Sequence, residues 1–285
     1  MMDKLSFIKG VLSANAEIIS PLQGGMMNDS SIITDGEKKY VLYISTTQAN
    51  EMVDRVLERE NQALVFSLGI TSKNVYFDTD KGIKINEFIE GSSLDKIDSY
   101  DVKKVANLLH ILHNSPILCK VDYNPFARLE GYENELKIFC PERDEMYLEI
   151  RNELFKHRLY LENQRKVLCH NDAQKSNIIK SINDEYFLID FEFMGNNDPI
   201  YDIATFGNAE VREGFELLKE YAPNPSKDLM KRYYLWRMYI SLQWNTVALI
   251  KHYRGEGKIH HFNFLDVGAH FLANAYIAYQ EFKKL

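Results

Sequence analysis

The side chains best suited to chemistry in this chain lie in one short stretch. It begins with His170-Asn171-Asp172, continues at Asn177 and ends with Asp190-Phe191-Glu192. A carboxylate such as Asp172 can take the proton of an attacking hydroxyl, while Asn177 and Asp190 offer hard oxygen ligands for Mg²⁺ beside nucleotide phosphates. Phosphoryl transfer requires positioned oxygens, a metal clamp and an oriented nucleophile. The stretch therefore predicts a kinase that uses ATP and Mg²⁺, with Asp172, Asn177 and Asp190 as catalytic residues.

His170, within this stretch, and Asp202, which follows it, are expected to position the loop. His170 is interpreted as a packed histidine that orients the loop by hydrogen bonds, not as an acid or a base. Asp198-Pro199 and Asp202 lie at the entry to a predicted helix, where Asp favours the first turn and Pro is tolerated. Asp202 is expected to brace the catalytic loop through hydrogen bonds to its backbone.

The composition fits a folded protein of one large domain or two smaller ones. Of 285 residues, 45% are hydrophobic and 26% are charged, and the formal net charge of -7 argues against a broad basic surface for nucleic acid. Cys119, Cys140 and Cys169 have no paired spacing, which favours a reducing, cytoplasmic setting over a disulfide or zinc framework. Residues 1–20 contain no continuous apolar block, and no run anywhere reaches about 18 apolar residues, so no membrane insertion is expected.

Residues 1–90 are predicted to form a small sheet with two helices. Asp35-Gly36 between two β-rich runs is typical of a hairpin. Asn50 is expected to cap a long helix, and Gly69 is expected to end it. The expected elements are helices at 5–12 and 52–68 and strands at 31–34, 39–45, 74–78 and 83–89.

From Gly91 onward the pattern becomes mainly helical. The expected elements are helices from 102 to about 163, a strand at 167–168, a hairpin of 177–180 and 186–189, and helices from about 200 to the end. A small β-rich region before a larger helical one predicts an α+β fold with two lobes. Residues 1–90 are assigned to nucleotide binding, and residues 91–285 to catalysis and substrate binding.

The motifs resemble the choline/ethanolamine kinase family. The most specific match is Cys169-His170-Asn171-Asp172 with Asn177-Ile178-Ile179, followed by residues 189–193 and 197–204. Two more segments match. Residues 22–28 are similar to the family's glycine-containing nucleotide loop, and residues 83–91 are similar to its hinge. The resemblance covers most of the chain from Leu22 to Ala204 and is nearest to the bacterial choline kinases. It implies the two-lobed, protein-kinase-like fold shared with aminoglycoside phosphotransferases.

The resemblance also implies a role for each matched residue. Asp172 would orient or deprotonate the acceptor alcohol, and Asn177 and Asp190 would bind Mg²⁺. Glu58 would stand where the family has a helix glutamate that pairs with a phosphate-binding cation. The residues implied in ATP binding are Gly24, Gly25 and Asn28 at the phosphates and Asn86, Glu87 and Phe88 at the adenine.

The chain departs from the family pattern at Tyr43, where a Lys or Arg that neutralises ATP phosphates is expected. Tyrosine cannot supply that charge. Lys39 is on the same strand face but about 13 Å away, whereas Arg55 or Arg59 could substitute from the helix. Without a substitute, weak ATP binding or a degraded kinase is the expected consequence.

The expected acceptor is a small amino alcohol, choline first. Aromatic faces and a nearby carboxylate hold a quaternary ammonium group. The candidate substrate contacts are Asp172, Glu192, Glu210, Tyr239 and Trp244. The resemblance places an acid where this chain has Ala209, and Glu210 beside it is the candidate replacement, so ethanolamine or another amino alcohol stays open.

Two alternative functions stay open from the sequence. An aminoglycoside or sugar kinase of the same fold would act on a different acceptor. A nucleotide-binding pseudokinase would lack turnover, and Tyr43 is the sequence feature that favours it.

Overall fold

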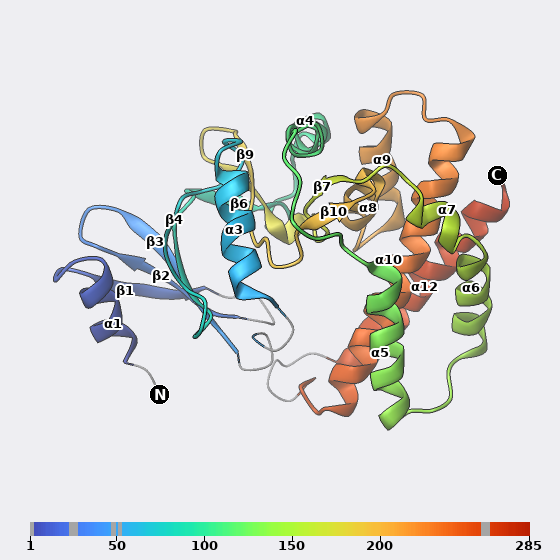
Figure 1. Ribbon diagram of the computed structural model, residues 1–285, viewed down its shortest axis with the longest axis horizontal. Helices are drawn as coiled ribbons and strands as arrows, with labels where there is room; N and C mark the ends of the chain where they lie inside the picture. The colour runs from blue at the N-terminus through green and yellow to red at the C-terminus, as the bar shows by residue number, and fades with distance from the viewer. Residues whose placement is uncertain (1–2, 23–27, 47–49, 51–52, 258–262) are drawn as a thin grey trace. The chain divides into compact units, whose positions relative to one another are not determined.

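The computed structural model describes residues 3–22, 28–46, 50, 53–257 and 263–285 (Figure 1). The chain divides into two compact units, Met1–Tyr100 with Ser176–Met194, and Asp101–Lys175 with Gly195–Leu285. This division differs from the predicted boundary at residue 90. The hairpin that follows Asn177 belongs to the first unit because its strand β8 (Ile178–Ser181) pairs with β6 (Gly91–Ser93). The functional assignment of residues 1–90 and 91–285 stays a prediction.

The first unit contains a five-stranded antiparallel sheet in the order β1-β2-β3-β5-β4. Its strands are β1 (Glu17–Leu22), β2 (Asn28–Thr34), β3 (Lys39–Ser45), β4 (Asn74–Asp78) and β5 (Ile83–Glu87). The predicted hairpin between β2 and β3 is confirmed. Oδ1 of Asp35 accepts hydrogen bonds from the N–H groups of Glu37 at 2.9 Å and Lys38 at 2.8 Å, and Gly36 takes the φ of +101° that the turn requires.

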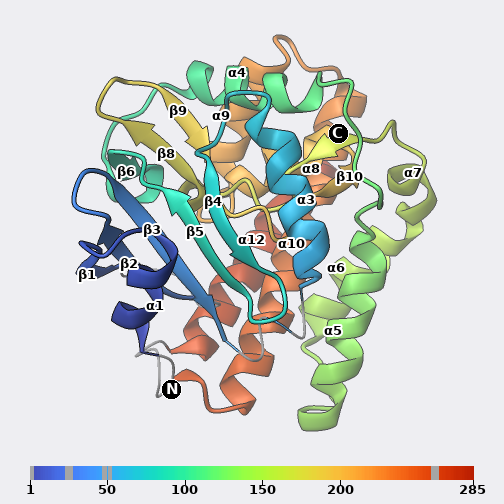
Figure 2. The ribbon, with the colours of Figure 1, turned by 60° about the vertical axis from the view of Figure 1, so that its left-hand side comes forward.

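Two helices accompany this sheet, α1 (Lys4–Val11) beside β1 and α3 (Arg55–Phe66) beside β4 (Figure 2). Asn50 does not cap α3, because the helix begins later and the side chain of Asp54 accepts the hydrogen bond from Leu57 N–H at 3.0 Å. Gly69 follows the helix with φ +72°, as predicted for its end. The core on the α1 side of the sheet contains Ile8, Ala16, Ile33, Tyr40, Leu42, Ile83 and Ile85.

The rest of the first unit is a three-stranded sheet in the order β6-β8-β9, with β9 at Tyr186–Leu188. The predicted hairpin of β8 and β9 is confirmed. A Cβ atom at Gly91 would lie 2.2 Å from the carbonyl oxygen of Lys180, so only glycine allows β6 to approach β8 this closely. The short 3-10 helices η1 (Leu94–Lys96) and η2 (Lys175–Asn177) flank these strands in sequence.

The second unit is mostly helical, with one short antiparallel pair of strands. The strands are β7 (Val167–Cys169) and β10 (Gly195–Asn197). The helices are α4 (Val102–His113), α5 (Pro125–Phe139), α6 (Glu145–Lys156), α7 (Arg158–Glu162), α8 (Pro199–Phe206), α9 (Val211–Tyr221), α10 (Lys227–Tyr253) and α12 (Phe264–Lys283). Helix α10 packs along α12 and also against α5, α8 and α6, so it is the centre of this unit (Figure 1).

The core around α10 is rich in large side chains. Trp236 and Tyr239 pack edge-on against each other with ring centroids 5.7 Å apart, and both contact Tyr201 of α8. Buried Arg237 donates a hydrogen bond to the carbonyl oxygen of Ala204 at 2.7 Å. A sheet-containing unit and a helical unit confirm the predicted α+β class. Among the described residues, we find no helix with the length and apolar character to cross a membrane.

Candidate active site

The loop after β7 is held by a single buried carboxylate. Oδ2 of Asp202 accepts a hydrogen bond from the N–H of His170 at 2.8 Å, and its Oδ1 accepts one from the N–H of Asn171 at 2.7 Å. The Nε2 atom of His113 lies 3.0 Å from Oδ2 as well. Asn171 takes a left-handed φ of 62°, which Asn tolerates better than most residues. The prediction that Asp202 braces this loop is confirmed.

Asp172 follows directly from this braced backbone and is half-buried. Its N–H donates to Nδ1 of His170 at 3.2 Å, and its Oδ2 accepts a hydrogen bond from Nε2 of Gln174 at 3.2 Å. His170 has no exposed surface and uses Nδ1 as an acceptor, in agreement with an orienting role. His170 therefore holds the backbone of Asp172, and Gln174 contacts its carboxylate. The role of Asp172 as a proton acceptor stays a prediction.

Replacing Asp202 by Ala is expected to destabilise the protein strongly. The substitution leaves two buried N–H groups and the His113 ring without their acceptor, and each unsatisfied buried group costs about 1–3 kcal/mol. We expect the free energy of unfolding, measured with urea, to fall by about 3 kcal/mol or more. The exposed Asp95 provides the control Asp95→Ala, expected within about 0.5 kcal/mol. Equal stability of both variants would refute the bracing role.

The two predicted metal ligands belong to the first unit and are linked by backbone. The N–H of Ile189 donates to the carbonyl oxygen of Asn177 at 3.0 Å, which ties the start of β8 to the residue before Asp190. Carboxylate oxygens of Asp190, Glu58 and Glu192 lie within 4.8 Å of one another. The Asp190 side chain is 33% exposed, against 1% for Glu58. The partly exposed carboxylate of Asp190 and the amide oxygen of Asn177 are hard oxygen donors of the kind that Mg²⁺ takes, so these residue types fit the predicted metal.

Glu58 of α3 joins two cations in the same unit. Its Oε2 pairs with Nη1 of Arg55 at 2.6 Å and its Oε1 pairs with Nζ of Lys84 at 2.5 Å. Burial alone would raise the pKa of Glu58, but the attraction of Lys84 and then Arg55 outweighs it and holds the pKa below its ordinary value. Glu58 is therefore a charged helix glutamate with a cation at each carboxylate oxygen. Its role at ATP, which the resemblance implies, stays a prediction.

Glu192 and Asn28 are part of the same network. Oε1 of Glu192 accepts hydrogen bonds from Nη1 of Arg55 at 3.1 Å and from Nδ2 of Asn28 at 2.9 Å. Burial and then the charge of Asp190 raise the pKa of Glu192. The contacts of Glu192 are thus with residues of the first unit, whereas its role at a substrate stays a prediction. Gly24 and Gly25, the other predicted phosphate contacts, lie outside the described residues.

The predicted adenine contacts have their main-chain donors engaged. The N–H of Glu87 donates to the carbonyl oxygen of Lys73 at 2.9 Å, and the N–H of Phe88 donates to that of Lys39 at 3.0 Å. Asn86 is buried and accepts a hydrogen bond from Nδ2 of Asn74 at 2.8 Å. A base bound here would therefore meet carbonyl oxygens or side chains rather than these two N–H groups.

The predicted substrate contacts of the second unit occupy different surroundings. Tyr239 has no exposed surface, and its hydroxyl oxygen lies 2.5 Å from the carbonyl oxygen of Pro125 and 2.7 Å from Oε1 of Gln243, so its one proton is shared between these two acceptors. Trp244 is half-buried and stacks on Phe271 with ring centroids 6.2 Å apart. Glu210 is exposed at the N-cap of α9 and makes no capping hydrogen bond. Among the described residues we find no contact that joins Tyr239, Trp244 and Glu210, so their common role at a substrate stays a prediction.

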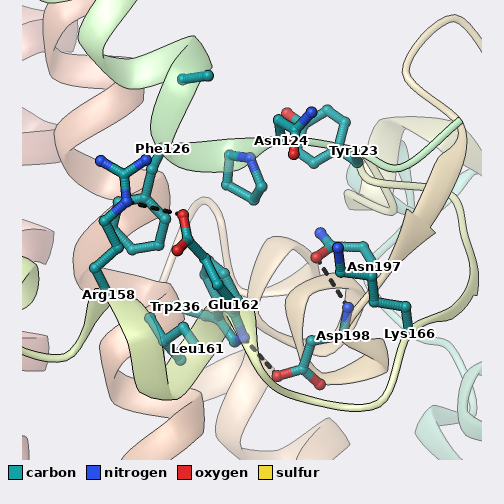
Figure 3. Close-up of a pocket in the computed structure, with 12 residues that line it drawn as sticks. Tyr123, Asn124, Phe126, Arg158, Leu161, Glu162, Lys166, Asn197, Asp198 and Trp236 are labelled. Atoms are coloured by element: carbon teal, nitrogen blue, oxygen red, sulfur yellow. Dashed lines mark hydrogen bonds and ion pairs between the residues drawn. The ribbon is translucent and has the colours of Figure 1, made fainter.

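A cavity of about 260 Å³ in the second unit was not expected from the sequence (Figure 3). Its lining includes Tyr123, Phe126, Arg158, Glu162, Asp198 and Trp236. The indole Nε1 of Trp236 donates to Oδ2 of Asp198 at 2.8 Å. Burial raises the pKa of Asp198, while Arg232 and Trp236 oppose that shift. Asp198 also caps α8, so its contacts here serve the helix that carries Asp202.

Lys84 is the charged residue of this region that the sequence analysis missed. It is 4% exposed and lies between Ile83 and Ile85 in β5. The available signal was a lysine between two isoleucines in a strand, since an unpaired buried charge is costly and so implies a partner. Naming that partner requires the strand pairing, which the sequence alone did not provide.

Comparison with known proteins agrees with this arrangement. A family model described as choline/ethanolamine kinase matches residues 19–212. Protein LicA of Haemophilus influenzae is 26% identical over 193 residues, which cover 64% of this chain and 55% of LicA. The chain thus matches about half the length of that curated relative.

Two solved structures are similar over nearly the whole chain. The choline kinase LicA from Streptococcus pneumoniae has a TM-score of 0.75 at 23% identity, covering 97% of each chain. A LicA structure in complex with AMP has a TM-score of 0.76 at 24% identity, covering 98% of this chain and 97% of LicA. These structures establish the fold, and the family match extends over more than half of the sequence. The chain belongs to the choline/ethanolamine kinase family.

Proposed function

We propose that the protein is a kinase that transfers the γ-phosphoryl group of ATP to the hydroxyl of a small amino alcohol, with choline as the first candidate and ethanolamine as the second. The observation that carries the proposal is the loop His170-Asn171-Asp172. Its backbone is held by Asp202, and it leaves one half-buried carboxylate, Asp172, within the segment matched by the family model. The AMP complex of LicA supports the nucleotide part of the proposal.

In the proposed reaction the hydroxyl oxygen of the acceptor attacks the γ-phosphorus in line. The bond between that phosphorus and the β–γ bridging oxygen breaks, ADP leaves, and the hydroxyl proton passes to Asp172. Asn177 and Asp190 would hold Mg²⁺, which neutralises charge on the phosphates when bound. Asp202 and His170 keep Asp172 oriented. We also propose that the protein acts in the cytoplasm, in keeping with three free thiols at Cys119, Cys140 and Cys169.

The test is ADP release from Mg-ATP with a panel of choline, ethanolamine, aminoglycosides and sugars as acceptors. We expect turnover with choline or ethanolamine, at about 1–100 s⁻¹ as for other kinases, and none above the background with aminoglycosides or sugars. Turnover with only a sugar or an aminoglycoside would show that the acceptor is not an amino alcohol, and the protein would then be a sugar or aminoglycoside kinase of the same fold. Nucleotide binding by calorimetry without turnover on any acceptor would favour a pseudokinase and refute the proposal.

A further inference from the structure

Lys84 is a buried cation at the centre of an acidic cluster in the first unit. Its Nζ lies 2.5 Å from Oε1 of Glu58 and 3.4 Å from Oδ1 of Asp190. Ile83 and Ile85, its neighbours in β5, belong to the core on one face of the sheet. Because side chains alternate along a strand, Lys84 lies on the other face, toward the glutamate of α3. Strand β5 therefore places the Lys84 ammonium beside both Asp190, the predicted metal ligand, and Glu58 of α3.

Tyr43 and Lys84 are cross-strand partners. The antiparallel ladder of β3 and β5 places them directly opposite each other, and residues in that relation share one face of a sheet with Cβ atoms about 5 Å apart. Nζ of Lys84 lies 4.9 Å from the centroid of the Tyr43 ring, within the range of a cation–π contact. The charge missing at Tyr43 is thus present one strand away, and the tyrosine ring supports it.

The surroundings keep Lys84 protonated. Burial by itself would lower its pKa, but the attraction of Glu58 and then of Asp190 and Glu192 outweighs burial and raises the pKa above its ordinary value. The same surroundings affect Tyr43, whose pKa burial raises to about 12, against the opposing effect of Lys84. Tyr43 is therefore a neutral ring, and Lys84 carries the charge.

The other cations that the sequence offered, Lys39, Arg55 and Arg59, either pair with other carboxylates or are exposed to solvent. Lys39 is about half exposed and pairs with Glu90 at 2.8 Å. Arg59 is exposed on α3. Arg55 is buried and pairs with Glu58 and Glu192, so it fixes the two glutamates. Of these residues and Lys84, only Lys84 has an ion pair with Asp190 among the described contacts.

We infer that Lys84, from β5, is the cation that binds the phosphates of ATP in this protein, in place of a residue at position 43 of β3. The inference rests on the proposed kinase function. Phosphoryl transfer in protein kinases requires two groups to be in place. One is a lysine that forms an ion pair with a helix glutamate, and the other is an aspartate that binds the metal ion. Lys84 pairs with both Glu58 and Asp190 at once. Its ammonium has three N–H donors, of which Glu58 and Asp190 engage two in the part of the chain that the structure describes.

The test compares Lys84→Met with Lys84→Arg and with the control Lys39→Met. For Lys84→Met we expect kcat/KM for ATP to fall about 100-fold, the typical loss of one donor at a developing charge, with the KM for the acceptor within about threefold. Lys84→Arg keeps the positive charge but changes the geometry of the donors, so its kcat/KM for ATP should fall less than that of Lys84→Met. Lys39→Met should stay within about twofold of the wild type, because its exposed ion pair contributes little.

A second variant separates charge from folding. Lys84→Met removes the ion pairs that Lys84 makes with Glu58 and Asp190, while Glu58 keeps its pair with Arg55. A thermal melt is therefore recorded for each variant. The double variant Tyr43→Lys with Lys84→Met, here called the relocated variant, places the cation on β3. Its kcat/KM for ATP should be at least about tenfold higher than that of Lys84→Met. A folded Lys84→Met with kcat/KM for ATP within threefold of the wild type would overturn the inference. The inference would also be overturned if Lys84→Met is unfolded while the relocated variant is folded and its kcat/KM for ATP stays low.

Nucleotide binding distinguishes failure of this inference from failure of the proposed function. Calorimetry measures the Kd of Mg-ATP and of adenosine for the wild type and for Lys84→Met. If Lys84 binds phosphates, the Kd of Mg-ATP rises and the Kd of adenosine does not, whether or not any acceptor is turned over. If both affinities are unchanged in a folded variant while the wild type is an active kinase, Lys84 is not the phosphate-binding cation.

Discussion

Asp172→Asn is expected to lower kcat by about 10³-fold at saturating ATP and acceptor. Asn has the same shape as Asp, and its side-chain oxygen can still accept the hydrogen bond that Gln174 donates to Oδ2. It cannot take a proton from the attacking hydroxyl. The loop itself should be intact, because its backbone is held by Asp202 and not by Asp172. Steady-state rates of ADP release over a range of both substrates measure the effect.

The matched control is Asp228→Asn, an exposed aspartate at the start of α10 in the same unit. It should leave kcat within about twofold, since surface substitutions of this kind rarely matter. The KM for ATP should change little in Asp172→Asn, because the substitution removes an interaction of the transition state and not of nucleotide binding. An Asp172→Asn enzyme with wild-type kcat would contradict the role of Asp172.

Asp190→Asn is expected to raise the Mg²⁺ concentration needed for half-maximal rate and to lower kcat/KM for ATP by about 10³-fold. The substitution would replace a charged ligand at the proposed Mg²⁺ site by a neutral one. Asn is the appropriate replacement, because residue 190 has a left-handed φ of 67° that Asn tolerates and most residues do not. A titration of MgCl₂ at fixed ATP measures both effects.

Glu192→Gln provides the comparison for the Asp190 variant. The Glu192 side chain is 3% exposed and is held by Arg55 and Asn28, so its oxygens are not open to a metal ion. It lies in the same cluster of carboxylates, so removing its charge tests whether local charge alone sets the response. Glu192→Gln should keep the wild-type Mg²⁺ dependence. Equal shifts in the two variants would mean that Asp190 acts through general charge and not as a ligand.

Features set by local chemistry could be predicted from the sequence. Asp35-Gly36 formed the hairpin because an aspartate that accepts two neighbouring N–H groups, followed by glycine, dictates the turn by itself. The bracing role of Asp202 could be predicted because its motif places an aspartate in the first turn of a helix that follows the loop motif His170-Asn171-Asp172. Asn50 was wrong as the cap of α3 because several residues near it could begin a helix, and Asp54 does so.

Features set by long-range pairing could not be predicted from the sequence. Lys84 was missed because its partners Glu58 and Asp190 are 26 and 106 residues away, and only the register of β3 on β5 reveals that it faces Tyr43. The helical spacing of aromatics in α10 did not show that this helix is buried on nearly all sides. Tyr239, expected at a substrate, is therefore enclosed by the core.

Transfer of the γ-phosphoryl group to choline is the most direct test of the central claim. ATP labelled with ¹⁸O in that group is incubated with the protein, Mg²⁺ and choline or ethanolamine, and the products are analysed by mass spectrometry. The account predicts a phosphorylated amino alcohol that carries the whole label, formed by the wild type and not by Asp172→Asn. Label found only in inorganic phosphate, with both amino alcohols unmodified, would contradict it.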